Sequence, residues 1–237
     1  GQGWLEESGD YRATARLDSF DLAAVAGDSL REAMDLAGSA DGRLSVKGNL
    51  DRGFRAAGEL SELALSARGE SLVLAAPFDF TVSPDSVSAR GLLLETSFGS
   101  LSGSFMYESS GAIVAEAMLD SIDLAGALGL LPDPPEYTPS GLVDGSLRIS
   151  GTRKAPVYVA DIEAVGLQMR GVALDTVSVY VEGDTTDVLF DLSIESASSG
   201  TFWAGGSVPV RRDTSGVFAF DPAREFGASV RGESFAL

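Results

Sequence analysis

The sequence contains no cysteine and no histidine, and it has only two lysines, one asparagine and two glutamines. Without histidine or cysteine, the chain offers no Ser-His-Asp triad, no cysteine nucleophile and no His- or Cys-ligated metal site. A disulfide framework is impossible, so cysteine usage says nothing about the redox compartment. The 17 basic and 35 acidic residues give a net charge of −18. Such a chain is a poor partner for nucleic acid, which is bound by Lys and Arg.

Long hydrophobic runs are also missing. No window of about 18 uninterrupted apolar residues suggests a membrane-spanning helix. The opening residues Gly1–Trp4 lack the basic and apolar regions of a signal peptide. The chain ends at Leu237, just after the start of a motif described below, so we expect it to be a piece of a longer protein. With 44% hydrophobic residues, it is not disordered by composition.

Apolar residues recur at every second position along much of the chain, which predicts strands with one apolar face. Short clusters of Gly, Ser and Asp separate these segments, as hairpin turns require. We count roughly sixteen candidate strands in an antiparallel meander. The strands are expected over 10–18, 43–47, 53–69, 72–82, 86–96, 98–108, 111–119, 156–170, 172–182, 188–195, 200–210, 216–221 and 226–232.

Two segments follow a helical period instead. In 20–37, apolar residues such as Leu22, Val25 and Leu30 recur at three- and four-residue spacing, which predicts a helix. In 122–131, a similar pattern predicts a shorter helix, ended by the prolines from Pro132 onward.

A long repeat is visible around both helical segments. The hexamer LDSFDL at 17–22 is matched by LDSIDL at 119–124, and DGRLSVKG at 41–48 by DGSLRISG at 144–151. We therefore predict a lead-in strand over 1–16, repeat unit one over 17–118, repeat unit two over 119–231 and the start of a third unit over 232–237. Each unit is a short helix followed by antiparallel strands, longer than the units of common solenoids.

These motifs resemble the repeats of TamB, the translocation and assembly module protein, and of AsmA-like proteins of bacterial envelopes. The resemblance rests on the LDxxDL start, on DGxLxxxG, and on a following Gly-Thr-x-x-x-Pro at 151–156. It covers the chain from about residue 17 onward. Unit one departs from the pattern, because Gly48 is followed by Asn49 instead of Thr and the segment has no following Pro.

The resemblance implies a protein of the periplasm of a diderm bacterium, held in the inner membrane by an N-terminal anchor that this fragment does not show. Family members form a long β-sheet curled into an open, taco-like trough with an apolar interior. They are thought to conduct phospholipid or other acyl-chain lipids between membranes in outer-membrane biogenesis. TamB works there with an outer-membrane partner of the Omp85 family.

A meander with one apolar face must cover that face. A second packed sheet, closure into a barrel and a curled trough filled partly by ligand all satisfy this requirement, and the pattern alone leaves them open. In the trough, the acidic residues would coat the outside, because a carboxylate inside an apolar groove costs several kcal/mol. We predict that a lipid-binding groove is lined by Leu44, Val46, Leu72, Leu74, Phe78, Phe80, Val82, Leu147, Ile149, Val188, Phe190, Leu192 and Ile194.

The sequence gives weaker signals for enzymatic activity or for sugar binding. Asp191 and Glu195 share a strand face as a carboxylate pair would, but solvated face residues explain them better. Phe202, Trp203 and Trp4 could stack on sugars, although Phe202 and Trp203 point to opposite faces. We expect no enzyme, no catalytic residue, no cofactor and no metal site. The alternative is a structural or adhesive all-β surface module with closed sandwich cores and no ligand.

Overall fold

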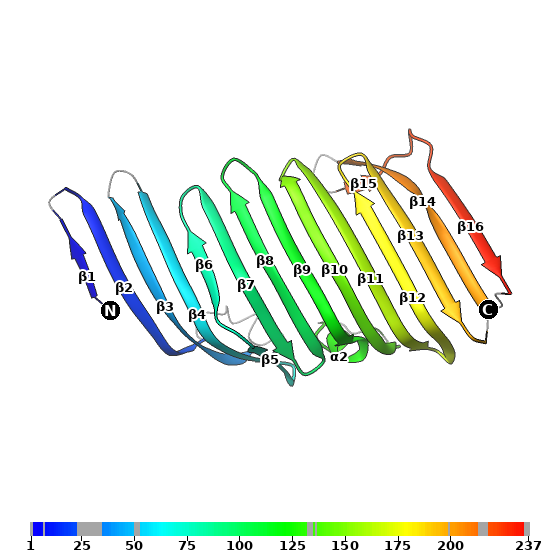
Figure 1. Ribbon diagram of the computed structural model, residues 1–237, viewed down its shortest axis with the longest axis horizontal. Coiled ribbons are helices and arrows are strands. Elements are labelled where there is room, and N and C mark those ends of the chain that lie inside the picture. The colour runs from blue at the N-terminus through cyan, green and yellow to red at the C-terminus, as the bar shows by residue number, and fades with distance from the viewer. Residues whose placement is uncertain are drawn as a thin grey trace. The chain divides into compact units, whose positions relative to one another are not determined.

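The computed structural model describes residues 2–6, 8–22, 35–49, 53–131, 135, 137–198, 200–212 and 218–234. Within these ranges the chain is almost entirely β-strand, as predicted (Figure 1). Sixteen strands form one antiparallel sheet, in which most strands pair with the strands next to them in sequence. The prediction of an all-β meander with about sixteen strands is therefore confirmed.

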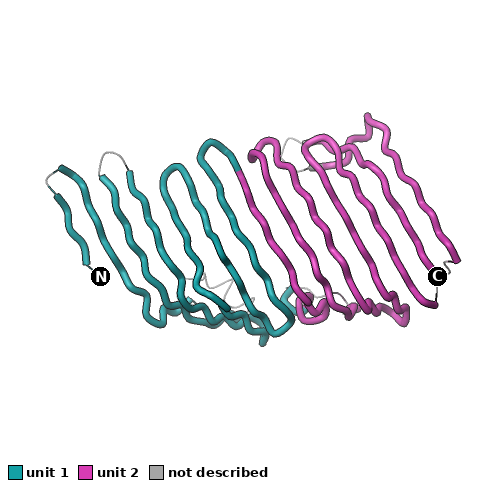
Figure 2. The backbone as a smooth tube through the Cα atoms, viewed as in Figure 1, with its two compact units in different colours: residues 1–112, 129–134 teal, residues 113–128, 135–237 magenta. Residues whose placement is uncertain are grey.

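The strands fall into two compact units, shown in different colours in Figure 2. Unit 1 comprises residues 1–112 and 129–134, and unit 2 comprises residues 113–128 and 135–237. The strands of unit 1 are β1 (Gln2–Leu5), β2 (Asp10–Asp21), β3 (Ala37–Asn49), β4 (Gly53–Ala67), β5 (Glu70–Leu74), β6 (Phe78–Val82), β7 (Ser86–Thr96) and β8 (Gly99–Glu108). Those of unit 2 are β9 (Ile113–Asp123), β10 (Ser140–Thr152), β11 (Ala155–Met169), β12 (Val172–Gly183), β13 (Asp187–Ser196), β14 (Gly200–Arg212), β15 (Phe218–Phe220) and β16 (Gly227–Glu233).

The helical predictions have different outcomes. One short helix, α2 (Leu124–Gly129), lies inside the range predicted over 122–131, and residue 122 belongs to β9. The helix predicted over 20–37 falls largely on residues 23–34, which lie outside the described residues. Its first two residues end strand β2 and its last residue begins β3.

Two strand pairs show where unit 1 departs from a simple hairpin ladder. Strands β5 and β6 both pair with β4 and with β7, so they act as one strand interrupted at residues 75–77. The 72–82 segment that the alternation predicted as continuous is thus broken. Figure 1 also shows the lower ends of β3 and β4 turned away from the direction of their upper ends.

Each repeat motif places a serine at a bulge with a positive φ. Ser19 has φ 47° and Ser121 has φ 52°, and the strand register shifts beside both. The Ser19 amide donates to Asp41 Oδ1 at 2.7 Å, and the Ser121 amide donates to Asp144 Oδ1 at 2.8 Å. A bulge bends its strand and strengthens the local twist. The LDS motif therefore marks a strand bend, held by the aspartate of the DG motif.

The two Arg-Gly turns of the repeat also share their geometry. Arg68 and Arg170 both have φ 51° and are both followed by glycine. In unit 1, Arg68 Nη1 donates to the Leu131 carbonyl at 2.8 Å. In unit 2, the Arg170 guanidinium stacks over the Tyr137 ring at 3.8 Å from its centroid. Each turn arginine thus holds part of the connection that follows α2.

The described strands have no second layer. Their extensive contacts are all between hydrogen-bonded neighbours in the sheet. The accessible surface is 14749 Å², whereas a compact protein of this mass exposes about 10,000 Å². The sheet therefore leaves apolar side chains without the protein cover that a folded domain normally supplies.

Candidate functional site: an uncharged sheet face

One face of the sheet in unit 1 carries apolar and other uncharged side chains. Residues paired across strands point to the same face, and neighbours along a strand point to opposite faces, so the register assigns each residue. We call this the uncharged face. In unit 1 its side chains larger than glycine are Leu5, Tyr11, Ala13, Ala15, Leu17, Phe20, Ala40, Leu44, Val46, Phe54, Ala56, Leu60, Leu63, Leu65, Leu72, Leu74, Phe78, Phe80, Val82, Val87, Ala89, Leu92, Leu94, Thr96, Leu101, Phe105 and Tyr107.

Unit 2 has an uncharged face of the same kind. The register again separates apolar side chains from charged ones on each strand. Its uncharged side chains larger than glycine are Ala115, Ala117, Leu119, Ile122, Val143, Leu147, Ile149, Pro156, Tyr158, Ala160, Ile162, Ala164, Gln168, Ala173, Val177, Val179, Val181, Val188, Phe190, Leu192, Ile194, Ser196, Phe202, Ala204, Val208, Val210, Phe220, Ala228 and Val230.

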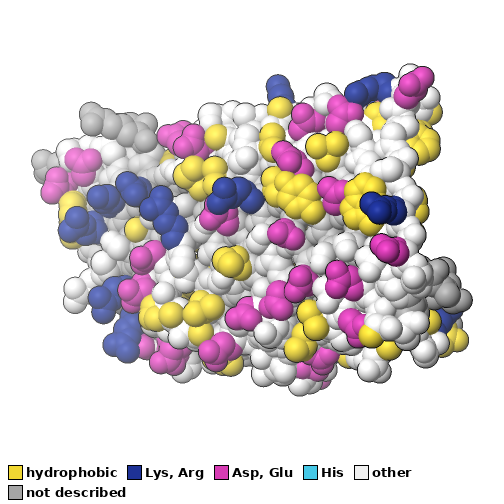
Figure 3. All heavy atoms as spheres, turned by 45° about the vertical axis from the view of Figure 1, so that its right-hand side comes forward, with side chains coloured by type: hydrophobic (Ala, Val, Ile, Leu, Met, Phe, Trp, Pro, Cys, Tyr) yellow, Lys and Arg dark blue, Asp and Glu magenta, His cyan; other side chains and the backbone are white. Residues whose placement is uncertain are grey.

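The opposite face, which we call the charged face, carries the acids and bases of these strands. The acids expected outside the groove, Glu59, Asp79, Asp191 and Glu195, all lie on it. The strand register places two carboxylates on the uncharged face itself, Glu70 and Asp175. Both lie near hairpin ends. Glu70 accepts a hydrogen bond from Ser97 Oγ, and Asp175 accepts one from the Ala197 amide. Figure 3 shows acidic side chains spread over much of the visible surface, with basic ones gathered toward its left.

The uncharged face is the more enclosed of the two. Five buried hydrophobic residues lie on it, namely Ala40, Ala56, Leu74, Leu94 and Ile122, whereas the buried Pro209 lies on the charged face. On β13, the four apolar side chains from Val188 to Ile194 are half-buried, whereas Leu189 and Asp191 on the charged face are exposed. The enclosure is incomplete, since Phe105 and Leu147 of the uncharged face keep 42% and 41% exposure.

All thirteen residues predicted to line a groove lie on the uncharged face of their own unit. Unit 1 contributes Leu44, Val46, Leu72, Leu74, Phe78, Phe80 and Val82, and unit 2 contributes Leu147, Ile149, Val188, Phe190, Leu192 and Ile194. In unit 1, Leu65 pairs with Leu72, and Leu74 pairs with Leu94. In unit 2, Phe190 pairs with Val181 and Gly206. Sequence alternation therefore identified the members of this surface, though not how they align across strands.

Three aromatic rings on the uncharged face lie across a glycine on the neighbouring strand. Phe80 covers Gly58, and Tyr158 covers Gly183. A Cβ at Gly183 would come within 2.5 Å of the Tyr158 hydroxyl. Tyr11 covers Gly48 in the same way, with a Cβ at that glycine 2.7 Å from the hydroxyl. Glycine thus lets these rings lie along the sheet, which keeps the uncharged face shallow.

Partial burial affects the Tyr158 hydroxyl. Desolvation raises the pKa of Tyr158, and the nearby charge of Asp184 raises it further. The phenol therefore stays neutral at physiological pH.

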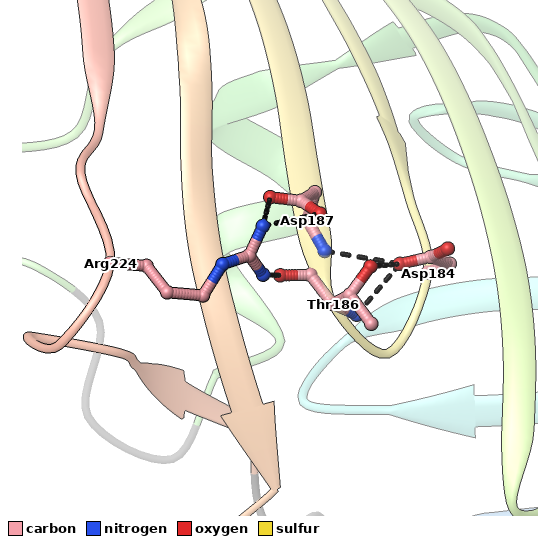
Figure 4. Close-up of polar contacts among 4 residues, drawn as sticks. All are labelled: Asp184, Thr186, Asp187 and Arg224. Atoms are coloured by element: carbon pink, nitrogen blue, oxygen red, sulfur yellow. Dashed lines mark hydrogen bonds and ion pairs between the residues drawn. The ribbon is translucent and has the colours of Figure 1, made fainter.

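A polar cluster in unit 2 has a structural explanation (Figure 4). Asp184 Oδ1 accepts hydrogen bonds from the Thr186 amide at 2.7 Å and from the Asp187 amide at 3.0 Å. These bonds lower the pKa of Asp184. Arg224 Nη2 contacts Asp187 Oδ1 at 2.9 Å, and its Nη1 donates to the Thr186 carbonyl at 2.9 Å. The cluster joins the β12–β13 turn to the segment before β16, and it explains the aspartates here without a bound cation.

The described residues contain no group of His, Cys, Asp and Glu side chains arranged to hold a metal ion. Among the same residues, no helix is long and apolar enough to cross a membrane. Comparison with protein-family models, with curated proteins and with solved structures finds no match.

Sequence reasoning missed one cluster on the charged face. Arg12, Lys47 and Arg55 lie on three neighbouring strands and stand directly opposite one another in the register. They are far apart in the sequence, so only the strand register brings them into one row.

Proposed function

We propose that the uncharged face of each unit holds the acyl chains of lipids. The observation that carries the proposal is a broad apolar surface that no described element covers, on the more enclosed side of the sheet. Burying an acyl chain against such a surface contributes about 0.8 kcal/mol per CH₂. The binding needs no catalytic residue, and the two carboxylates on this face, Glu70 and Asp175, lie near hairpin ends rather than in its middle.

We further propose, from the resemblance to TamB and AsmA-like repeats, that the chain is part of an envelope-spanning lipid-transfer protein. In this proposal it works in the periplasm, in outer-membrane biogenesis, between an inner-membrane anchor and an outer-membrane Omp85-family partner. The distribution of charge fits such a role. Acyl chains would lie on the uncharged face, while the acids of the charged face keep the protein soluble.

Lipid extraction and native mass spectrometry of the purified protein test the proposal. We expect phospholipid masses bound to the wild-type protein. Phe190→Glu puts a carboxylate on the uncharged face and is expected to reduce the bound lipid at least tenfold. Leu189→Glu is the matched control, because Leu189 lies one position away on the charged face and is 49% exposed.

The same measurements separate the proposal from its alternative. If the wild-type protein carries no lipid and takes up none from vesicles, the acyl-chain role is wrong and a structural module without ligand is favoured. Equal lipid loading in Phe190→Glu and the wild type would also contradict the role of this face.

A further inference from the structure

Arg12, Lys47 and Arg55 form a row of positive charges on the charged face, which we call the cationic row. It is the strongest feature that acyl-chain binding leaves unexplained. The register pairs Arg12 with Lys47 and Lys47 with Arg55, so three positive charges lie in a line across β2, β3 and β4. Neighbouring strands are about 4.8 Å apart. Like charges directly opposite one another destabilise a sheet. The row therefore carries an energetic cost in the free protein.

The described residues do not neutralise this row. Arg12, Lys47 and Arg55 are all exposed, and none of them forms an ion pair with another described residue. A second row, four residues away along each of these strands, carries both signs, with Arg16 opposite Arg43 and Glu59 opposite Asp79. There Arg43 stands opposite Glu59, and Asp79 stands opposite Arg90. The same unit thus contains a row that carries charges of both signs and a row that carries positive charges alone.

An aromatic side chain extends the cationic row. Trp4 stands directly opposite Arg12 on the edge strand β1 and is 49% exposed. Trp4 and the three cations line one open cleft of about 650 Å³, with Pro84 at its far side. This volume lies within the range of small-ligand sites, and the cleft is open to solvent.

Two acids also line the cleft, at its borders. Asp10 is already engaged, because its carboxylate accepts hydrogen bonds from Asn49 Nδ2 and Ser8 Oγ, both at 2.8 Å. Asp85 lies in the turn between β6 and β7. The middle of the cleft is therefore positive, and a ligand there meets one cation on each of three strands.

We propose that this cleft binds an anionic saccharide with one negative group on each sugar ring. A polyuronate has this chemistry, because every ring carries a carboxylate. Its carboxylates would pair with Arg12, Lys47 and Arg55, while a terminal ring stacks on Trp4. Arg offers planar, bidentate contacts that suit carboxylates. Tyr11 and Phe54 of the uncharged face also border the cleft, but the proposed contacts use charged-face side chains, so the proposal does not depend on lipid binding.

Other anionic partners fit less well. A large acidic protein surface is repelled by the net charge of −18 beyond the cleft. Single-stranded nucleic acid is usually held by several aromatic side chains interleaved with cations, whereas this row has one aromatic residue at its end.

Tryptophan fluorescence tests the proposal in the full chain. Trp203→Phe leaves Trp4 as the sole tryptophan, so its emission reports on the cleft. We expect tetragalacturonate to change the emission saturably and neutral maltotetraose to have no effect. Arg12→Gln, Lys47→Gln and Arg55→Gln should each weaken binding about fivefold, and Asp85→Asn should strengthen it. Arg43→Gln and Arg90→Gln are the matched controls and should leave the affinity within twofold.

Three outcomes would overturn the proposal. The first is equal binding of tetragalacturonate and maltotetraose, or none by either. The second is full competition by inorganic phosphate at the same concentration as the saccharide, which would make the cleft a simple anion site. The third is tighter binding of a short oligothymidylate than of tetragalacturonate. Circular dichroism of each variant checks that the sheet is retained.

Discussion

The two faces of this sheet are built from the same strands, yet they differ in every property that governs binding. On β13, Phe190 and Leu192 are half-buried among other apolar side chains, while Asp191 between them is exposed. The buried Ala, Leu and Ile residues belong to the uncharged face, whereas the ion pair Arg148–Glu116 and the buried Pro209 belong to the charged face. Because a strand has a period of two, alternation alone yields a sheet that is apolar on one side and charged on the other.

The largest difference between the faces should be seen when a charge enters the uncharged one. Leu74 is 8% exposed, and Leu74→Asp would bury a carboxylate without a partner. We expect the free energy of unfolding to fall by about 3 kcal/mol. Val73 is the neighbouring residue on the charged face, is 44% exposed and stands opposite Glu95, so Val73→Asp should lower the free energy of unfolding by no more than about 1 kcal/mol. Urea unfolding of both variants measures the contrast, and equal losses would mean that the faces are wrongly assigned.

A second contrast concerns volume rather than charge. Gly58 lies under the Phe80 ring on the uncharged face, so Gly58→Val must displace the ring. Overpacking of this kind costs about 2 kcal/mol. Ala57→Val adds bulk at the next position, which is exposed on the charged face, and should be close to neutral. Thermal unfolding of the two variants compares them, and a neutral Gly58→Val would show that Phe80 does not rest on the neighbouring strand.

Residues of the charged face should contribute to the free energy of unfolding mainly where they hold a strand bend. Asp41→Ala and Asp144→Ala each remove the acceptor for a bulge amide, Ser19 in unit 1 and Ser121 in unit 2. We expect each change to cost about 1 kcal/mol. Asp191→Ala is the control, because this aspartate lies on the charged face of β13, whose pairings with β12 and β14 have no register shift. A much larger loss for one repeat than for the other, measured by urea unfolding, would show that the two bends are not equivalent.

The smallest effect on the free energy of unfolding is expected from replacing Asp184. Hydrogen bonds from Thr186 and Asp187 lower its pKa in the folded protein. Its contribution to stability is therefore fully present above the ordinary carboxyl pKa, near pH 4, and is lost as the pH falls through the lowered value. The difference in unfolding free energy between the wild type and Asp184→Ala should shrink on acidification below about pH 4. A difference that is constant with pH would mean that these hydrogen bonds do not favour the ionised form.

Local sequence pattern predicted most of the fold and placed thirteen residues together that all lie on the uncharged face. This was possible because alternation records which side of a strand faces the apolar surface. The bends were not predicted, since LDS at 17–19 and at 119–121 has the composition of a helix cap. Ser19 and Ser121 instead adopt positive φ at bulges, held by aspartates more than twenty residues away.

The sequence pattern also did not predict features that depend on how residues align between neighbouring strands. The cationic row needs Arg12, Lys47 and Arg55 to align across three strands, and a shift of one residue would move Lys47 to the opposite face. The glycines under Phe80, Tyr158 and Tyr11 likewise depend on which residue stands opposite each ring.

Photo-cross-linking with a fatty acid that carries a diazirine on its acyl chain tests the central claim most directly. After irradiation and proteolysis, mass spectrometry locates the labelled residues. The account predicts labels on uncharged-face residues such as Leu74, Phe80, Phe190 and Leu192, and few on their charged-face neighbours Val73 and Leu189. Labels divided equally between the two faces, or confined to the charged face, would contradict it.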